Sequence, residues 1–284
     1  MPAQPHKENE PNYPQSGKMI AVCSAKGGVG RTVLTTNIAV TLASKGLKAC
    51  ILDGCFQFGD IHLALDLQPM FSINDVIEQL ETIDSDNLWH YLNRHDSGLR
   101  ILTAPTRPEY ADLVTIKALD KITNLLLSKL NYLLVDTMSG LHEQTLFFME
   151  RADEIFIITD LEMATLKNTK MMLSVLDTLD LRHKVRIIVN RSTMQSVITT
   201  RDVPQILGQE SIFYIPNDFE VVSKSMNIGL PFIIKNRRAD ISKDIISMVE
   251  QFTSVDAASI YEPPTTPSSL SFFQKFKSKK ERVK

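Results

Sequence analysis

Short apolar runs rich in branched residues recur along the chain, each bounded by polar or turn-forming residues. Their length and composition predict buried strands. The predicted strands are Met19–Cys23, Ala49–Leu52, Leu99–Leu102, Tyr132–Val135, Ile155–Ile158, Val185–Val189 and Ile212–Ile215. Longer segments with helical periodicity lie between most of them: Thr32–Ser44, Ser72–Leu80, Ile116–Leu130, Leu141–Ala152 and Ala164–Leu179, with Ile241–Phe252 as the last helix.

The alternation of strands and helices predicts a doubly wound α/β fold. Its sheet is expected to be mostly parallel and covered by helices on both faces, as in P-loop NTPases. In such a fold the ligand lies at the carboxyl ends of the strands. The loops after Cys23, Leu52, Val135 and Val189 should therefore meet at one site.

Length and local composition divide the chain into four parts. Residues 19–253 are long and apolar enough to form one P-loop domain, since 43% of the 284 residues are hydrophobic. Residues 1–18 are polar with four prolines and predict a disordered leader. Residues 254–268, with three prolines and several hydroxyl residues, predict a linker. Residues 269–284 form a separate tail.

Charge and cysteine content narrow the class of protein. The formal net charge of −2 gives no overall electrostatic footprint for nucleic acid, so DNA is not an expected partner. Three cysteines without metal-ligand spacing predict free thiols and a reducing, cytoplasmic compartment. The leader lacks the apolar core of a signal peptide, and no stretch reaches the roughly 18 to 20 apolar residues that a spanning helix needs.

A glycine-rich loop joins the first predicted strand to the first predicted helix. It reads Lys26-Gly27-Gly28-Val29-Gly30-Arg31-Thr32. Glycines let backbone N–H groups turn toward phosphate oxygens, a basic side chain reaches the terminal phosphates, and the hydroxyl of Thr32 suits Mg²⁺. The alternative is a strand-to-helix turn that binds nothing, but the strand before and the helix after favour a phosphate site.

This loop resembles that of the deviant Walker A ATPases, the family that includes MinD and ParA. Lys26 matches the signature lysine, which in that family reaches the partner's phosphates in a nucleotide-sandwich dimer. The resemblance implies ATP and Mg²⁺ as ligands and an ATP-driven homodimer. Ala25 and Arg31 depart from the usual loop, because they replace its first glycine and its phosphate-binding lysine. Arginine keeps the charge but is a planar fork, which favours phosphate binding over turnover.

Two strand-end carboxylates also match the family. Asp53 begins a segment similar to the family's Asp-x-Asp motif, whose second aspartate is Cys55 here, and Asp136 resembles the Walker B aspartate. The resemblance implies that Thr32, Asp53 and Asp136 hold Mg²⁺ and that Lys26, Asp53 and Asp136 serve ATP hydrolysis. A thiol cannot supply the carboxylate's fixed charge. Cys55 is either a cause of slow or absent hydrolysis or a small loop residue without a special role.

Two later strand ends match the family's base-binding positions. Asn190 and Arg191 follow one predicted strand, and Pro216, Asn217 and Asp218 follow another. In the family the asparagine reads the base edge and the proline turn packs around adenine. Each of these residues alone is also typical of an ordinary turn. Their order along the chain favours nucleotide binding.

Three segments resemble the CpaE/TadZ branch of pilus-assembly ATPases: Gln57–Asp60, Leu102–Glu109 and Pro216–Asp218. The resemblance spans about Met19 to Phe252 and implies a switch that localises or assembles a pilus or secretion apparatus, with that machinery as partner. The alternatives are a MinD-like or flagellar-number regulator and a ParA-like partitioning ATPase. A basic DNA-binding surface would be required for the last.

The carboxyl tail combines apolar and basic residues. Residues 269–284 hold six basic residues and one acidic, and a helix there would place aromatic side chains beside lysines. This composition predicts a weak interfacial anchor on the inner face of the cell membrane, strengthened when a dimer presents two copies. A solvated basic tail or a docking peptide for a protein is the alternative. The expected membrane contacts are Leu270, Phe272, Phe273, Lys275, Phe276 and Lys277.

Overall fold

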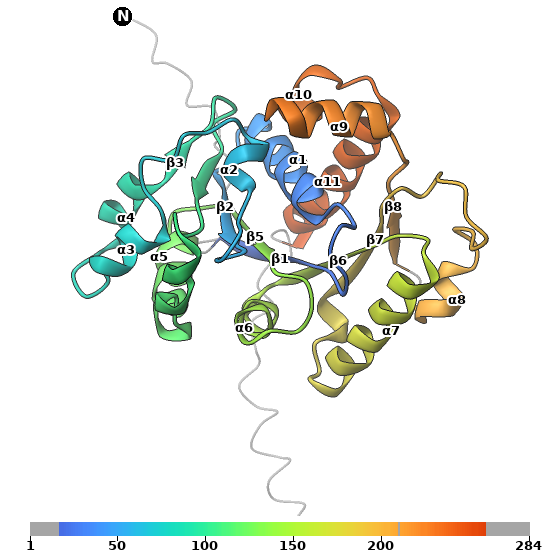
Figure 1. Ribbon diagram of the computed structural model, residues 1–284, viewed down its shortest axis with the longest axis horizontal. Coiled ribbons are helices and arrows are strands. Elements are labelled where there is room, and N and C mark those ends of the chain that lie inside the picture. Colours follow the sequence, from blue (N-terminus) through green and yellow to red (C-terminus); the bar gives the residue numbers. More distant parts are fainter. Residues whose placement is uncertain (1–16, 210, 260–284) are drawn as a thin grey trace, which may run out of the picture.

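The computed structural model describes residues 17–209 and 211–259. These residues form one eight-stranded sheet between two layers of helices (Figure 1). The order of strands is β3-β4-β2-β5-β1-β6-β7-β8, and every pairing is parallel except that of β3 with β4. The predicted doubly wound α/β fold is confirmed. The strands are β1 (Lys18–Cys23), β2 (Ala49–Gly54), β3 (Asn93–Arg94), β4 (Arg100–Leu102), β5 (Tyr132–Thr137), β6 (Glu154–Thr159), β7 (Val185–Val189) and β8 (Ile212–Tyr214).

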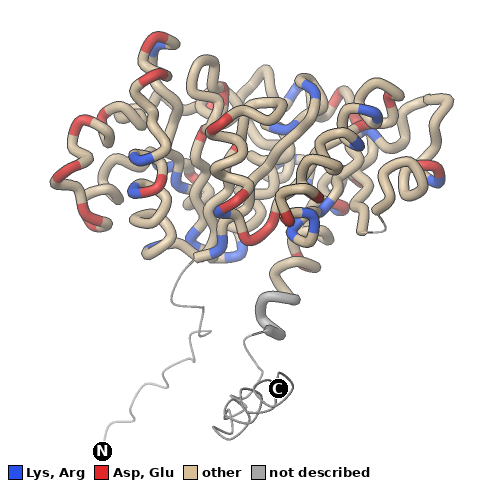
Figure 2. Tube along the Cα trace, turned by 90° about the horizontal axis from the view of Figure 1, so that it is seen from below, with Lys and Arg blue, Asp and Glu red and all other residues tan. Residues whose placement is uncertain are grey.

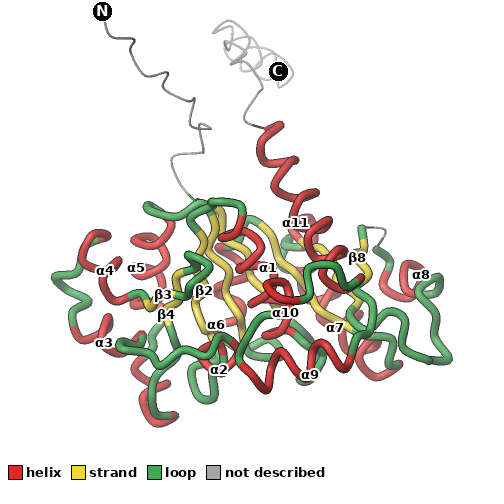
Figure 3. The backbone as a smooth tube through the Cα atoms, turned by 90° about the horizontal axis from the view of Figure 1, so that it is seen from above, coloured by secondary structure: helices red, strands yellow, loops and turns green. Residues whose placement is uncertain are grey.

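Helices cover both faces of the sheet (Figure 3). One layer holds α3 (Ile73–Glu78), α4 (Ser85–Tyr91), α5 (Ile116–Leu127), α6 (Glu143–Arg151), α7 (Met163–Thr178) and α8 (Val203–Leu207). The other holds α1 (Arg31–Ser44), α2 (Ile61–Ala64), α9 (Phe219–Ile228), α10 (Phe232–Lys235) and α11 (Asp240–Ser259). Two 3₁₀ turns, Pro108–Leu113 and Arg182–Lys184, connect elements at the surface.

Each central strand feeds two separate cores, because successive side chains of a strand point to opposite faces. On β1, Met19, Ala21 and Cys23 belong to the core under α5–α7, while Ile20 and Val22 belong to the core under α1 and α11. Burial on both faces explains why these strands are uninterrupted apolar runs in the sequence.

The parallel register brings the predicted site residues to one edge of the sheet. Val22 pairs with Asp136 across β1 and β5, and Asp53 pairs with Asp136 across β2 and β5. Asp53 and Asp136, near the ends of β2 and β5, are therefore neighbours at the carboxyl edge, beside the end of β1. The expected meeting of these loops is confirmed.

The hydrophobic pattern did not predict several short elements. Strand β3 has two residues, and helices α2, α4, α8, α9 and α10 have four to ten, too few turns for most of them to show a clear period. The last helix runs to Ser259 instead of ending near Phe252, so the first six residues of the predicted linker are helical. The physical reason is that no glycine or proline interrupts the chain between Asp240 and Glu262.

The two ends of the chain lie mostly outside the described residues. Lys18, the last residue of the predicted leader, already begins β1, and Gly17 donates a backbone hydrogen bond to the carbonyl of Leu127 at 2.8 Å. The basic tail with its six expected membrane contacts is not described, so the leader and the tail stay predictions. All three cysteines are free, as predicted. Within the described residues, no helix has the length and apolar character to cross a membrane.

Candidate nucleotide-binding site

The glycine-rich loop follows β1 and leads directly into α1. Gly28 and Gly30 have φ values of 80° and 91°, which L side chains rarely adopt, and Gly30 is the N-cap of α1. A Cβ on Gly30 would also overlap the side-chain amide of Asn190. The loop therefore leads into the N-terminus of a long helix, whose first backbone N–H groups have no partner within the helix and where an anion is stabilised.

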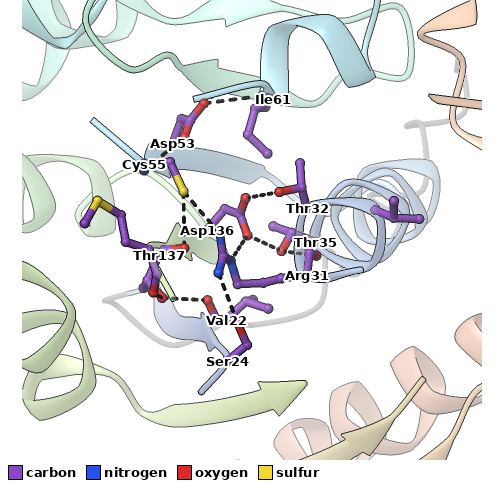
Figure 4. Close-up of polar contacts among 12 residues, drawn as sticks. Val22, Ser24, Arg31, Thr32, Thr35, Asp53, Cys55, Ile61, Asp136 and Thr137 are labelled. Atoms are coloured by element: carbon purple, nitrogen blue, oxygen red, sulfur yellow. Dashed lines mark hydrogen bonds and ion pairs between the residues drawn. The ribbon is translucent and has the colours of Figure 1, made fainter. Parts of the chain in front are cut away.

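Asp136 is the buried centre of the polar site (Figure 4). The hydroxyl of Thr32 donates to its Oδ2 at 2.7 Å, the hydroxyl of Thr35 donates to its Oδ1 at 3.1 Å, and Nε of Arg31 donates to the same Oδ1 at 3.1 Å. Burial raises the pKa of Asp136, and the Arg31 charge and the two hydroxyls act in the opposite direction. Thr35, one turn after Thr32 on α1, was not expected at the site. The spacing of three residues from Thr32 places both hydroxyls on one face of the helix, and this spacing could have identified Thr35 in the sequence.

Arg31 points beneath the loop. Its remaining guanidinium nitrogens donate to Oγ of Ser24 at 3.1 Å and to Sγ of Cys55 at 3.2 Å, and Figure 4 shows the fork between these residues and Asp136. Burial is the largest single influence on Arg31 and lowers its pKa, but the charge of Asp136 and smaller contributions, the hydrogen bond to Asp136 among them, together outweigh burial, so the pKa is raised and the group stays charged. The sequence predicts a side chain aimed at phosphate. In this structure the guanidinium instead joins the ends of β1, β2 and β5.

Asp53 is fully buried and held by backbone. Its Oδ1 accepts from the N–H of Cys55 at 3.1 Å, and its Oδ2 accepts from the N–H of Ile61 at 3.3 Å. Burial, followed by the charge of Asp136, raises the pKa of Asp53 to about 8. A Cβ on Gly59 would overlap this carboxylate, so only glycine fits beside it. Asp53 therefore anchors the loop after β2, and its expected role toward Mg²⁺ stays a prediction.

Cys55 lies where the family motif has its second aspartate. Its Sγ donates to the carbonyl of Thr137 at 3.3 Å and receives the Arg31 contact. Burial raises the pKa of the Cys55 thiol to about 12, so the thiol is neutral at physiological pH. The position after β2 thus contributes a weak neutral acceptor to the site.

Lys26 lies at the exposed rim of the loop. Its Nζ forms an ion pair with Oε2 of Glu162, the N-cap residue of α7, at 2.8 Å. The hydrogen bond to Glu162 raises the pKa of Lys26, and the same bond lowers the pKa of Glu162. Glu162 was not expected at the site. No sequence signal identified it, because its place depends on how β6 leads into α7 beside the loop.

A cavity of about 220 Å³ opens beside the loop and gathers the predicted base-binding residues. Asn190 donates its side-chain amide to the carbonyl of Val29 at 2.8 Å, which links the end of β7 to the phosphate loop. Asp218 also caps α9, since its carboxylate accepts from the N–H of Val221. The predicted residues that line the cavity are Gly30, Asn190, Arg191, Pro216, Asn217 and Asp218. The cavity is also lined by Phe219, Val222 and Met226 of α9 and Ile241 of α11, which were not predicted at the site.

The oxygen atoms around Asp136 fit a magnesium ion. A threonine hydroxyl and a carboxylate are hard donors of the kind Mg²⁺ prefers, and this ion usually completes its shell with water and substrate phosphates. Among the described residues, no group of three or more His, Cys, Asp or Glu side chains could hold a metal ion. Thr32 Oγ1 and Asp136 Oδ2 lie 2.7 Å apart, and their role toward Mg²⁺ stays a prediction.

Sequence comparisons agree with the resemblance of the phosphate loop to MinD and ParA proteins. A family model described as ParA, NUBPL iron-transfer P-loop NTPase, matches residues 15–80. The septum site-determining protein MinD of Synechocystis is 26% identical over 227 residues, covering 78% of this chain and 83% of the relative. MinD of Thermotoga maritima is 24% identical over 243 residues, covering 83% and 88%.

Solved structures share the fold. A ParA family ATPase from Chlorobium tepidum superposes with a TM-score of 0.77 at 19% identity, covering 84% of this chain and 99% of that one. The cell division ATPase MinD of Pyrococcus furiosus gives 0.74 at 20% with the same coverage. MinD of Pyrococcus horikoshii, solved with Mg-ADP, gives 0.73 at 21%, covering 84% and 97%. By its loop, its fold and these comparisons, the chain is similar to P-loop NTPases of the ParA/MinD type.

Proposed function

We propose that this chain is a MinD-type nucleotide switch that binds ATP with Mg²⁺, dimerises on ATP and works at the inner face of the cell membrane. One observation carries the proposal: a phosphate loop at a helix N-terminus lies beside a base-sized cavity and below an exposed signature lysine. These three parts serve the phosphates, the base and a second subunit respectively.

The chain's own residues divide the work. Asn190 and the Pro216–Asp218 turn hold the base in the cavity, and the backbone of the Lys26–Thr32 loop binds the phosphates. Thr32 and Asp136 position Mg²⁺, which neutralises phosphate charge when it is bound. Lys26 leaves Glu162 and reaches the phosphates of a second copy.

Slow hydrolysis follows from the residues at the carboxyl end of β2. A water that attacks the γ-phosphate needs a positioned base or orienting group. Cys55 contributes a neutral thiol, and Asp53 is occupied by two backbone N–H groups. The catalytic roles assigned to Lys26, Asp53 and Asp136 are therefore proposed for a weak ATPase, whose nucleotide-bound state is long-lived.

The comparisons change which cellular function we propose for the switch. The sequence motifs favour a CpaE/TadZ-like pilus function, but the relatives described above are MinD and ParA proteins and give that function no support. A MinD-like regulator of division or flagella is the better proposal. A DNA partitioning role would require a basic face, and in the view of Figure 2 the Lys and Arg residues of the described chain are interspersed with Asp and Glu.

The test is binding to vesicles of anionic and neutral lipid in the presence of ATP, ADP or no nucleotide. We expect the full chain to sediment with anionic vesicles only with Mg-ATP. The variant Lys26→Ala should bind nucleotide yet stay monomeric and unbound, and removal of residues 269–284 should abolish vesicle binding while dimerisation persists. Vesicle binding that is equal in all nucleotide states would refute the switch.

A further inference from the structure

The guanidinium of Arg31 is shared among three strand ends. It contacts Asp136 on β5, Ser24 after β1 and Cys55 after β2, each at 3.1–3.2 Å. Figure 4 shows these contacts as dashed lines. To bind a phosphate of the proposed nucleotide ligand, this side chain must give up some of these contacts.

The three acceptors hold Arg31 with different strength. Asp136 is a carboxylate that also receives the hydroxyls of Thr32 and Thr35, so it keeps two hydrogen bonds but loses its counter-charge if the arginine leaves. Ser24 offers a hydroxyl oxygen, whereas the Cys55 sulfur is a weak acceptor. The thiol contact is therefore the easiest to break.

The identity of residue 55 determines how firmly the arginine is held. A carboxylate at this position would lie within hydrogen-bond distance of the guanidinium and form a charge-assisted bond, which is about twice as strong as a neutral one. Arg31 would then be fixed between two carboxylates on neighbouring strands. A lysine carries its three donors on one nitrogen, so it does not reproduce the fork in which Nε, Nη1 and Nη2 of Arg31 each contact a different residue.

We infer that Cys55 is a positioning residue for Arg31: its neutral thiol keeps the arginine free to turn from the strand ends to the phosphates of a bound nucleoside triphosphate. The inference rests on the proposed nucleotide-binding function. Arg31 and Cys55 then form a matched pair, in which the loss of the family's carboxylate accommodates the arginine. Restoring that carboxylate alone should harm nucleotide binding.

The experiment is a double-mutant cycle on the full chain, read out by the affinity for a fluorescent ATP analogue with Mg²⁺ and by the unfolding temperature without nucleotide. In the Arg31 background, Cys55→Asp should weaken affinity about tenfold or more and raise the unfolding temperature of the apo protein. In the Arg31→Lys background the same change should alter affinity by less than about threefold.

Two further variants test how nucleotide affinity depends on the strength of the hydrogen-bond acceptor at position 55. Cys55→Ala removes the acceptor and should raise affinity, while Cys55→Ser supplies a better acceptor than sulfur and should lower it about two- to threefold. If Cys55→Asp does not fold, the serine and alanine variants still decide, because equal affinities for alanine, cysteine and serine overturn the inference.

The outcomes separate this inference from the proposed function. Equal loss of affinity on Cys55→Asp in both backgrounds shows no coupling and overturns the inference while leaving nucleotide binding intact. Absence of nucleotide binding in every variant overturns the proposed function. In that case the apo arm tests the pair: stabilisation by Cys55→Asp with Arg31 but not with Arg31→Lys supports it, and equal effects in both backgrounds overturn it.

Discussion

Lys26 and Arg31 belong to one loop and have opposite surroundings. Lys26 pairs with Glu162 at 2.8 Å, and their side chains are 42% and 51% exposed. Arg31 pairs with Asp136 at 3.1 Å, and these side chains are 13% and 0% exposed. One cation faces solvent at the rim, and the other links three strands inside.

The difference indicates separate functions for the two cations. An exposed ion pair is screened by water and salt, so Lys26 can exchange Glu162 for another anion at little cost. A buried pair has lost its hydration, so removing either member leaves an uncompensated charge. We therefore expect Arg31 and its partners to affect stability and Lys26 to affect association.

The largest expected effect comes from removing the buried acceptor. Asp136→Ala leaves the Arg31 guanidinium and two threonine hydroxyls without their shared partner, and should lower the free energy of unfolding by about 3–5 kcal/mol. The measurement is urea unfolding of the apo protein.

Its matched control is another aspartate–arginine pair. Asp120 pairs with Arg151 at 2.6 Å, but their side chains are 48% and 32% exposed. Asp120→Ala should therefore change the free energy of unfolding by less than about 1 kcal/mol. Equal losses for the two substitutions would contradict the distinction between buried and exposed pairs.

The next effect is a pH dependence from Asp53. Burial, aided by Asp136, raises its pKa from 3.8 to about 8, so the folded protein keeps a proton that the unfolded chain has released. The stability from this proton is complete below the unfolded pKa and is lost as the pH rises toward the folded one. The free energy of unfolding should thus fall with pH by up to about 1.4 kcal/mol per unit in this window.

The measurement is urea unfolding between about pH 5 and about 9, for the natural chain and Asp53→Asn. The amide cannot titrate, so the variant should lack this decline, although it loses one backbone hydrogen bond at every pH. Identical pH profiles for the two proteins would show that Asp53 is ionised in the folded state.

The smallest effect on stability is expected at the rim. Lys26→Ala should leave the unfolding midpoint of the apo protein unchanged, because Lys26 and Glu162 are hydrated in the pair and after its loss. The same change should abolish the sedimentation shift that Mg-ATP causes, because the lysine serves the partner subunit. Lys170→Ala, an exposed lysine on α7, is the control and should dimerise normally. A Mg-ATP dimer of Lys26→Ala would contradict the proposed dimer.

Long apolar segments made the fold predictable. Buried strands such as β1 and β6 are continuous apolar runs, and long helices such as α7 keep a clear period, so both were expected within a few residues. Helix α9 was missed although it lines the base cavity. Its apolar residues Phe219, Val222 and Met226 recur at helical spacing and line the same cavity, so the sequence did carry a signal for this helix.

Many residues of the candidate site could also be predicted from the sequence, but the residues that they contact could not. The glycines, Lys26, Thr32, Asp136 and Asn190 follow predicted strands in the family's order, so local sequence sufficed to find them. The Glu162 partner of Lys26 and the Thr35 contact to Asp136 depend on distant segments meeting. No local pattern encodes such contacts.

By itself the sequence determined the fold class, the phosphate loop and the presence of a cation at position 31, because periodicity and glycine placement are local properties. Only the tertiary structure decided where that cation points. Ser24, Cys55 and Asp136 come from three strands and meet because parallel pairing aligns their carboxyl ends. Arg31 lies among them because the buried carboxylate and two neutral acceptors together satisfy all three of its nitrogens.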